Sequence, residues 1–167
     1  ICFTLKKHLK RNQPPNTFNQ WIRNRKKPER QLLIFVPTIQ LAEKMKEKIE
    51  AILLREGVID KRCQVQFVHA EDPDREEKIN LFRQRQLRVL ITATILERGV
   101  TFPSVDVAII DAGHTVFDEA ALVQIAGRAG RSVDDPTGEV IFFHDGKNEA
   151  IMNAIDAIKK MNKRAGF

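Results

Sequence analysis

The chain has 167 residues, a length that suits one globular domain with a real hydrophobic core. Hydrophobic residues make up 43% of it and charged residues 30%, as in an ordinary soluble protein. No apolar run reaches the roughly 20 residues that span a bilayer, so we expect no membrane insertion. The two cysteines, Cys2 and Cys63, lack the spacing of a zinc site or a disulfide framework, which indicates reduced thiols in a cytosolic protein.

The positive charge is unevenly placed along the chain. The net charge is +6, yet residues 1–30 carry nine Lys and Arg side chains against one acid, while the remainder carries 19 basic and 21 acidic residues. A basic run of this kind favours a phosphate-backbone partner. It is equally typical of a solvated linker, and charge alone leaves both interpretations open. The nine basic residues are Lys6, Lys7, Lys10, Arg11, Arg23, Arg25, Lys26, Lys27 and Arg30.

The same N-terminal segment contains one helical pattern and no strand alternation. Asn16 is a candidate helix cap, and Phe18, Trp21 and Ile22 follow it at i, i+3, i+4 spacing. Such a stripe usually faces a core, so we expect this helix to pack on the main domain rather than to bind a ligand. The abrupt start without Met predicts that the chain is part of a longer protein.

Further along, apolar runs alternate with amphipathic stretches. We predict strands over residues 32–36, 65–68, 89–91, 105–110 and 139–143, and helices over residues 39–55, 74–83, 117–126 and 148–163. Gly57 is the expected end of the first of these helices, and Asp74 is the expected cap of the second. The alternation predicts an α/β domain with a mainly parallel β-sheet flanked by helices.

Polar residues directly follow several of these apolar runs. Ligands of parallel sheets gather at the carboxyl ends of the strands, so we expect Thr38, residues 92–94 and residues 111–114 near one edge of the sheet. His69 and His144 also follow strands. Ordinary loop histidines explain them better than a metal site, because a site would need several ligands to converge.

The most specific segment is Gln124-Ile125-Ala126-Gly127-Arg128-Ala129-Gly130-Arg131. Each arginine follows a glycine, which lets the backbone approach another surface closely. Guanidinium groups fork onto phosphate oxygens, so Arg128 and Arg131 are suited to reach a γ-phosphate across a cleft. The alternative is a pair of surface arginines that complement a helix C-terminus.

A second informative segment covers residues 89–103, Val-Leu-Ile-Thr-Ala-Thr-Ile-Leu-Glu-Arg-Gly-Val-Thr-Phe-Pro. Thr92 and Thr94 follow the end of a predicted strand. Hydroxyls and free backbone N–H groups at such a position can bind a nucleic-acid phosphate. Gly99 allows a tight turn near a nucleotide. A capped helix after a strand end is the alternative explanation.

Together, and in this order, the two segments resemble motifs V and VI of superfamily 2 helicases, and residues 32–38 are similar to motif IV. The resemblance covers roughly residues 31–165. Residues 35–38 and 94–103 look closest to the late competence proteins of the ComFA family, bacterial DNA-uptake ATPases related to the PriA and RecG type of DNA motor. The resemblance implies a RecA-like three-layer fold and the second motor domain of an ATP-dependent DNA helicase or translocase.

The resemblance also implies roles at the matching positions. Arg128 and Arg131 match the catalytic arginines that face the γ-phosphate, and Gln124 matches the polar residue that opens motif VI. Two departures weaken the interpretation as an RNA helicase: Ile125 stands where such members often carry Arg, and Thr101 where they often carry Asp. The other implied contacts are Glu97 and Gly99 near the nucleotide, and Thr38, Thr92 and Thr94 at the nucleic-acid backbone.

Half of an ATPase site is missing from the sequence. No GxxxxGKS or GxxxxGKT phosphate loop is present, and no acidic metal box follows an apolar strand. The resemblance therefore implies that ATP and Mg²⁺ are held mainly by an N-terminal RecA-like domain of the same protein. Residues 1–30 would be a basic linker from that domain, and residues 31–167 the helicase C-terminal domain. We expect this chain alone to bind neither cofactor and to lack ATPase activity.

Partners and location follow from the same resemblance. It implies single-stranded DNA as the nucleic acid, a role in DNA uptake during competence, and a cytoplasmic location in a bacterium, with other DNA-uptake proteins recruiting it to the inner face of the membrane. Three alternatives stay open at this point. One is a catalytically silent RecA-like module that binds DNA or a protein. The others are a double-stranded DNA translocase and an RNA helicase domain.

Overall fold

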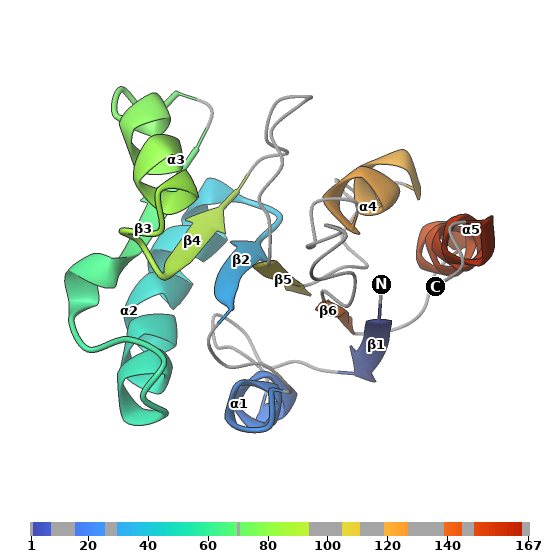
Figure 1. Ribbon diagram of the computed structural model, residues 1–167, viewed down its shortest axis with the longest axis horizontal. Coiled ribbons are helices and arrows are strands. Elements are labelled where there is room, and N and C mark those ends of the chain that lie inside the picture. The colour runs from blue at the N-terminus through green and yellow to red at the C-terminus, as the bar shows by residue number, and fades with distance from the viewer. Residues whose placement is uncertain are drawn as a thin grey trace.

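Six parallel strands form a single sheet, in the order β1-β6-β5-β2-β4-β3, in the computed structural model of the chain (Figure 1). The structure describes residues 2–7, 16–25, 30–69, 71–93, 105–110, 119–126, 139–144 and 149–164. The strands are β1 (Cys2–Lys7), β2 (Gln31–Phe35), β3 (Val65–Val68), β4 (Val89–Thr92), β5 (Val105–Ile110) and β6 (Glu139–His144). The helices are α1 (Asn16–Arg23), α2 (Ile39–Arg55), α3 (Arg75–Arg83), α4 (Glu119–Ala126) and α5 (Glu149–Arg164), with a short 3₁₀ turn η1 (Arg62–Gln64).

The predicted α/β pattern is confirmed, with element ends within two residues of those expected. The expectation that residues 1–30 hold no strand was wrong. Strand β1 pairs with β6 along its whole length, from Cys2 opposite Glu139 to Lys7 opposite His144. It lies at the edge of the sheet, where charged residues are common because they discourage further pairing. Its two lysines therefore weakened the alternation that marks a strand.

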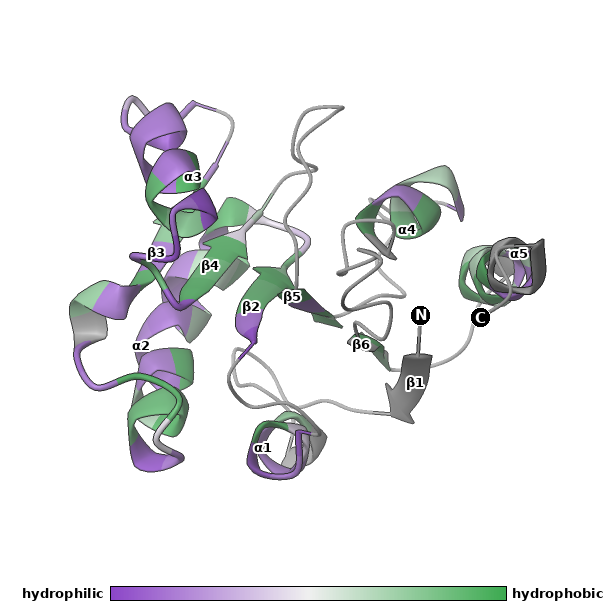
Figure 2. Ribbon diagram, viewed as in Figure 1, coloured by the Kyte–Doolittle hydropathy of each residue, from purple (hydrophilic) through white to green (hydrophobic). Residues whose placement is uncertain are grey.

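Strands β2 to β6 each contribute side chains to two hydrophobic cores, one on either face of the sheet. Helices α1 and α2 cover one face, and α3, α4 and α5 cover the other (Figure 1). In β2, Leu33 and Phe35 pack toward α3–α5, while Leu32 and Ile34 pack toward α1 and α2, and all four are buried. Each such side chain contributes roughly 1.5–3 kcal/mol by leaving water. Figure 2 accordingly shows apolar strands between helices of mixed character, and no described helix is both long and apolar enough to cross a membrane.

Local signals set both ends of α2. The Thr38 backbone is extended, and its Oγ1 accepts a hydrogen bond from the Leu41 N–H at 3.1 Å, which caps the helix. At the other end, Gly57 adopts a left-handed φ of 75°. The Val58 N–H then donates to the Leu53 carbonyl at 2.9 Å, as in a Schellman motif. The predicted stop at Gly57 is confirmed.

Helix α3 begins differently from the prediction. Asp74 precedes it, but the Asp74 side chain makes no capping hydrogen bond. The carboxylate of Asp72 acts instead: Oδ1 accepts the Asp74 N–H at 2.9 Å, and Oδ2 pairs with Lys78 Nζ at 2.6 Å. The hydrogen bond from Lys78 lowers the pKa of Asp72 below its ordinary value. The backbone N–H at the start of α3 is therefore hydrogen-bonded by Asp72, which lies two positions upstream of the expected cap.

Helix α1 packs on the sheet, as its apolar stripe predicts. Phe18, Trp21 and Ile22 are buried. The ring of Phe143 in β6 meets Phe18 at 5.7 Å and Trp21 at 6.2 Å between centroids, both in edge-on geometry. Such aromatic contacts favour a defined orientation in addition to burying apolar area. The helix is therefore part of the domain core.

Two arginines that follow α1 form ion pairs with one buried carboxylate. Arg25 donates from Nε and Nη2 to Asp106 Oδ2 at 3.1 and 2.8 Å, and Arg30 Nη1 donates to Oδ1 at 3.2 Å. All three side chains are 3% exposed or less. The Arg25 guanidinium also lies 5.7 Å from the centre of the Trp21 ring. Asp106 is the second residue of β5, so the cluster fastens the N-terminal segment to the amino edge of the sheet.

These contacts change the interpretation of the basic N-terminal segment. Arg25 and Arg30 share the carboxylate of Asp106 inside the domain, and Arg23 pairs with Glu56 at 3.1 Å. The expectation that the basic residues of this segment serve a phosphate backbone is therefore wrong for the buried Arg25 and Arg30, whereas for Arg23, whose side chain is 62% exposed, it stays a prediction. Residues 1–30 contribute a strand, a helix and a buried ion cluster to the domain, and their role as a linker to a preceding domain stays a prediction.

Candidate nucleotide and nucleic-acid site

The strand ends of the motif IV and motif V segments lie side by side at the carboxyl edge of the sheet. Strands β2 and β4 are neighbours, with Phe35 opposite Thr92. The Val36 N–H donates to the Thr92 carbonyl at 2.9 Å, which carries the pairing one residue beyond β2. Pro37 then ends the run. Because ligands of parallel sheets bind at this edge, both segments leave the sheet where a site is expected.

Thr38 combines a structural bond with an available donor. Its Oγ1 accepts the Leu41 N–H, which uses one lone pair of the hydroxyl. A hydroxyl also carries a hydrogen that rotates to suit a second partner. The residue is half-buried, so the group is accessible. Thr38 can therefore cap α2 and donate to a phosphate oxygen at the same time.

Thr92 is the last residue of β4 and is fully buried. Its main-chain carbonyl ties β4 to β2, and the next residue, Ala93, is half-buried. The other predicted motif V residues, Thr94, Glu97 and Gly99, lie outside the described residues. The contacts of Thr92 and Thr94 with a nucleic-acid backbone, and of Glu97 and Gly99 with a nucleotide, stay predictions.

The motif VI segment begins on α4. Leu122 and Ile125 are fully buried in the core, whereas Gln124 is exposed. Ile125, which departs from the RNA-helicase pattern, therefore serves as a packing residue that fixes the helix. Arg128 and Arg131 lie outside the described residues, and their place at a γ-phosphate stays a prediction.

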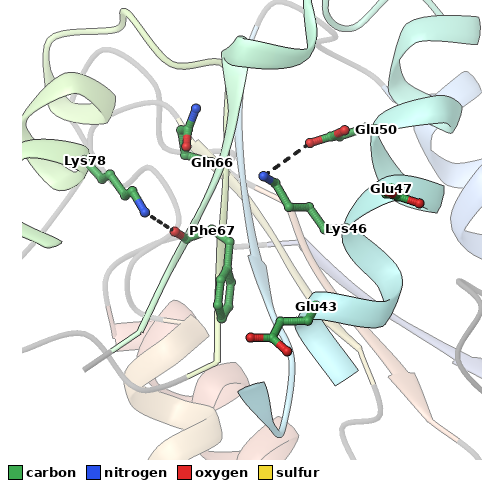
Figure 3. A pocket seen from close by; sticks show the side chains of 7 residues that line it. All are labelled: Glu43, Lys46, Glu47, Glu50, Gln66, Phe67 and Lys78. Carbon is green, nitrogen blue, oxygen red and sulfur yellow. Dashed lines mark hydrogen bonds and ion pairs between the residues drawn. The ribbon is translucent and has the colours of Figure 1, made fainter. Parts of the chain in front are cut away.

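One residue beside β3 was not singled out by the sequence. Lys78 of α3 donates to the Phe67 carbonyl at 2.9 Å (Figure 3). It also pairs with Asp72 at 2.6 Å. It therefore satisfies a carbonyl of the outermost strand and holds the turn that follows His69, whose ring lies 5.5 Å from that of Phe67. No spacing rule connects these positions, so the sequence carried no signal for this contact.

A polar cavity of about 430 Å³ lies between α2 and β3 (Figure 3). Lys46 pairs with Glu50 at 3.6 Å, and Lys78 is already engaged. Since its cations are compensated within the domain, the cavity lacks the converging donors that a phosphate group needs. Among the described residues, no group of three or more His, Cys, Asp or Glu could hold a metal ion. The cavity is lined by Glu43, Lys46, Glu47, Glu50, Gln66, Phe67 and Lys78.

Residues 14–133 match the family described as the helicase conserved C-terminal domain, a stretch that starts ahead of α1 and runs through the motif VI segment. The chain belongs to this family. The solved C-terminal domain of the DEAD-box protein Dbp5 has the same fold: it aligns with 96% of this helicase C-terminal domain and 83% of its own chain, with a TM-score of 0.61 and 23% identity. The predicted RecA-like three-layer architecture is confirmed.

Two relatives are competence proteins. Competence protein ComFA of Bacillus subtilis (strain 168) is 43% identical over 164 residues, which are 98% of this chain and 34% of the relative. Competence protein ComFA of Streptococcus pneumoniae (strain ATCC BAA-255 / R6) is 41% identical over 161 residues, 96% of this chain and 36% of the relative. The predicted resemblance to ComFA is confirmed. The helicase C-terminal domain spans about a third of the length of these relatives.

Proposed function

We propose that this helicase C-terminal domain is the second motor domain of an ATP-dependent DNA helicase or translocase that acts in DNA uptake during competence. The observation that carries the proposal is the adjacency of the motif IV and motif V strand ends, which is fixed by the bond from Val36 to Thr92. Similarity of fold alone would leave the function open. The motif residues at this edge, in a chain 43% identical to ComFA of Bacillus subtilis, supply the specific support.

In this proposal ATP lies between this domain and an N-terminal RecA-like domain of the same protein, which holds most of the phosphates and Mg²⁺. Arg128 and Arg131 reach the γ-phosphate, and Gln124, Glu97 and Gly99 line the nucleotide. Arginine fingers accelerate phosphoryl transfer roughly 10³–10⁵-fold, because the guanidinium stabilises charge on the transferring group. The exposure of Gln124 on a helix anchored by its opposite face supports this assignment.

Single-stranded DNA follows the carboxyl edge of the sheet. Thr38 donates its hydroxyl hydrogen to the backbone, and Thr92 and Thr94 bring the motif V segment beside it. Thr38 and Thr94 carry short, neutral side chains, so they position phosphates without reading bases, while the buried Thr92 holds the strand end from which the motif V segment leaves. ATP closes the cleft and hydrolysis reopens it, so the two domains grip DNA in alternation. Other DNA-uptake proteins at the inner face of the membrane are the further partners that this role requires.

Alanine variants at Arg128 and Arg131 in the full-length protein test the ATP site. We expect DNA-stimulated kcat to fall roughly 10³-fold or more while KM for ATP changes far less, because these arginines act mainly in the transition state. Lysine at either position keeps the charge but not the planar fork, so it restores little activity.

Phosphate release in the presence of ATP, Mg²⁺ and single-stranded DNA measures these effects. The isolated 167-residue chain serves as the blank, with no expected turnover, because half of the site is absent. Near-normal kcat in both alanine variants would contradict the proposal. It would favour a module that binds DNA or a protein without hydrolysing ATP.

A further inference from the structure

Two connectors lie side by side at the amino edge of the sheet, where the chain enters β3 and β4. One runs from α2 to β3 over residues 56–64, and the other from α3 to β4 over residues 84–88. Arg88 joins them: its N–H donates to the Gln64 carbonyl at 2.9 Å, and its Nε donates to the Val58 carbonyl at 3.4 Å. This edge is opposite the strand ends that lead to the motif IV and motif V residues.

Basic side chains gather on these connectors and on the helix ends that lead into them. Arg83 ends α3 and Arg85 follows it, while Lys61 lies on the other connector, and all three are exposed. Arg55 ends α2, with a side chain that is 60% exposed. We call Arg55, Lys61, Arg83, Arg85 and Arg88 the amino-edge basic patch.

Nearby acids leave much of this positive charge uncompensated. The two connectors hold two acids, Glu56 and Asp60. Glu56 already accepts two hydrogen bonds, at 3.1 and 3.3 Å, from the arginine that ends α1, and it pairs with Arg55 of the patch at 3.4 Å. Within the described part of the chain, Lys61, Arg83 and Arg85 form no ion pair. The patch therefore presents cations that can accept an external anion.

Arg85 adopts a backbone conformation that is usual for glycine. Its φ is 65°, and among the described residues it alone has a positive φ without being glycine. Its N–H donates to the Phe82 carbonyl at 3.0 Å and the Gln86 N–H to the Leu81 carbonyl at 2.9 Å, the same motif that Gly57 completes after α2. A Cβ makes this conformation unfavourable. An arginine at a position that suits glycine indicates that its side chain has a functional role, because the unfavourable backbone conformation is otherwise easily avoided.

We propose that the amino-edge basic patch binds the phosphate backbone of a nucleic acid, as a contact separate from the carboxyl-edge site. Four of its five members are arginines, whose planar groups fork onto phosphate oxygens. A protein partner would require an apolar centre. The large hydrophobic side chain exposed among the described residues, Met152, instead lies on α5, at the end of the molecule away from β3 (Figure 1). The contact goes beyond the proposed motor function, because it needs no ATP hydrolysis.

The double variant Arg83→Gln with Arg85→Gly in the full-length protein tests the patch. Glycine suits a φ of 65° and glutamine is a good helix former, so the fold is retained. The charge-matched control is Lys44→Gln with Lys48→Gln, two exposed positions on α2 outside the patch. Fluorescent single-stranded and duplex oligonucleotides are each titrated with protein at several salt concentrations.

We expect the slope of log K against log salt to become shallower by roughly 1.4 on single-stranded DNA, or roughly 1.8 on duplex, if each arginine neutralises one phosphate. The probe whose slope changes tells which form of DNA the patch holds, and the control keeps the wild-type slope. If the double variant fails to fold, Arg85→Gly alone is expected to give about half of each change.

A wild-type slope on both probes would overturn the proposal. The slope is measured without ATP, so it does not depend on the proposed ATP site. Failure of the patch and failure of the proposed ATP site are therefore separate results.

Discussion

The two edges of the sheet use polar residues in opposite ways. Inside the amino edge, Arg25 and Arg30 both donate to the buried carboxylate of Asp106. At the carboxyl edge, Thr38 and Thr92 are short and neutral, and Thr38 keeps a hydroxyl hydrogen beyond the one bond it accepts. Charges that are paired inside the domain stabilise the fold, whereas the remaining hydroxyl hydrogen of Thr38 is available to a ligand. The comparison places stability at one edge and the proposed motor function at the other.

The largest effect on stability is expected from Asp106→Asn, which tests the structural role of the buried cluster at the amino edge. The amide cannot balance two buried guanidinium groups, so we expect the free energy of unfolding to fall by about 3–5 kcal/mol, as when one partner of a buried ion pair is removed. Urea unfolding of the chain, followed by circular dichroism, measures the change. Asp156→Asn on the exposed face of α5 is the matched control, with an expected change within about 0.5 kcal/mol. A decrease in the free energy of unfolding below about 1 kcal/mol for Asp106→Asn would show that the cluster contributes little to stability.

Variants of Thr38 separate its structural bond from its proposed contact with DNA. Thr38→Ala removes the cap of α2 and should lower the free energy of unfolding by about 1 kcal/mol. Thr38→Asp keeps an acceptor for the Leu41 N–H but adds a charge that repels phosphate, so stability should be retained while single-stranded DNA binding by the full-length protein weakens. Thr38→Ser should keep both properties. Unchanged DNA affinity in the aspartate variant would confine Thr38 to the helix cap.

A smaller effect is expected at the turn beside β3. Lys78 lowers the pKa of Asp72 below its ordinary value of 3.8, so the pair stabilises the folded state above that pH and loses its contribution as pH falls through the lower folded pKa. Asp72→Asn should therefore cost under about 1 kcal/mol near neutral pH, and the difference from wild type should shrink in acid. Thermal unfolding across pH 2–7 measures it, with Asp74→Asn as the control because Asp74 makes no capping bond. A difference that is independent of pH would argue against the ion pair.

Much of this domain was readable from local sequence patterns. The apolar runs and the i, i+3, i+4 stripes depend only on neighbours along the chain, so α2, β3 and β5 begin and end where predicted. The glycine at position 57 and the threonine at position 38 carry their end signals in their own chemistry. The order of Thr92, Thr94, Arg128 and Arg131 along the chain was likewise enough to indicate the helicase family.

Other features depended on contacts between residues that are far apart in the chain. Strand β1 exists because it pairs with β6, more than 130 residues later, and its own residues are only weakly strand-like. In the sequence, Arg25 has the features of a solvated cation. In the structure it is buried against Asp106, which lies 81 residues away on a central strand. Periodicity and residue type thus determined the elements, their order and the candidate motifs. Only the tertiary structure decided which basic residues are buried and which remain exposed, because burial of a charge depends on a partner that local sequence does not specify.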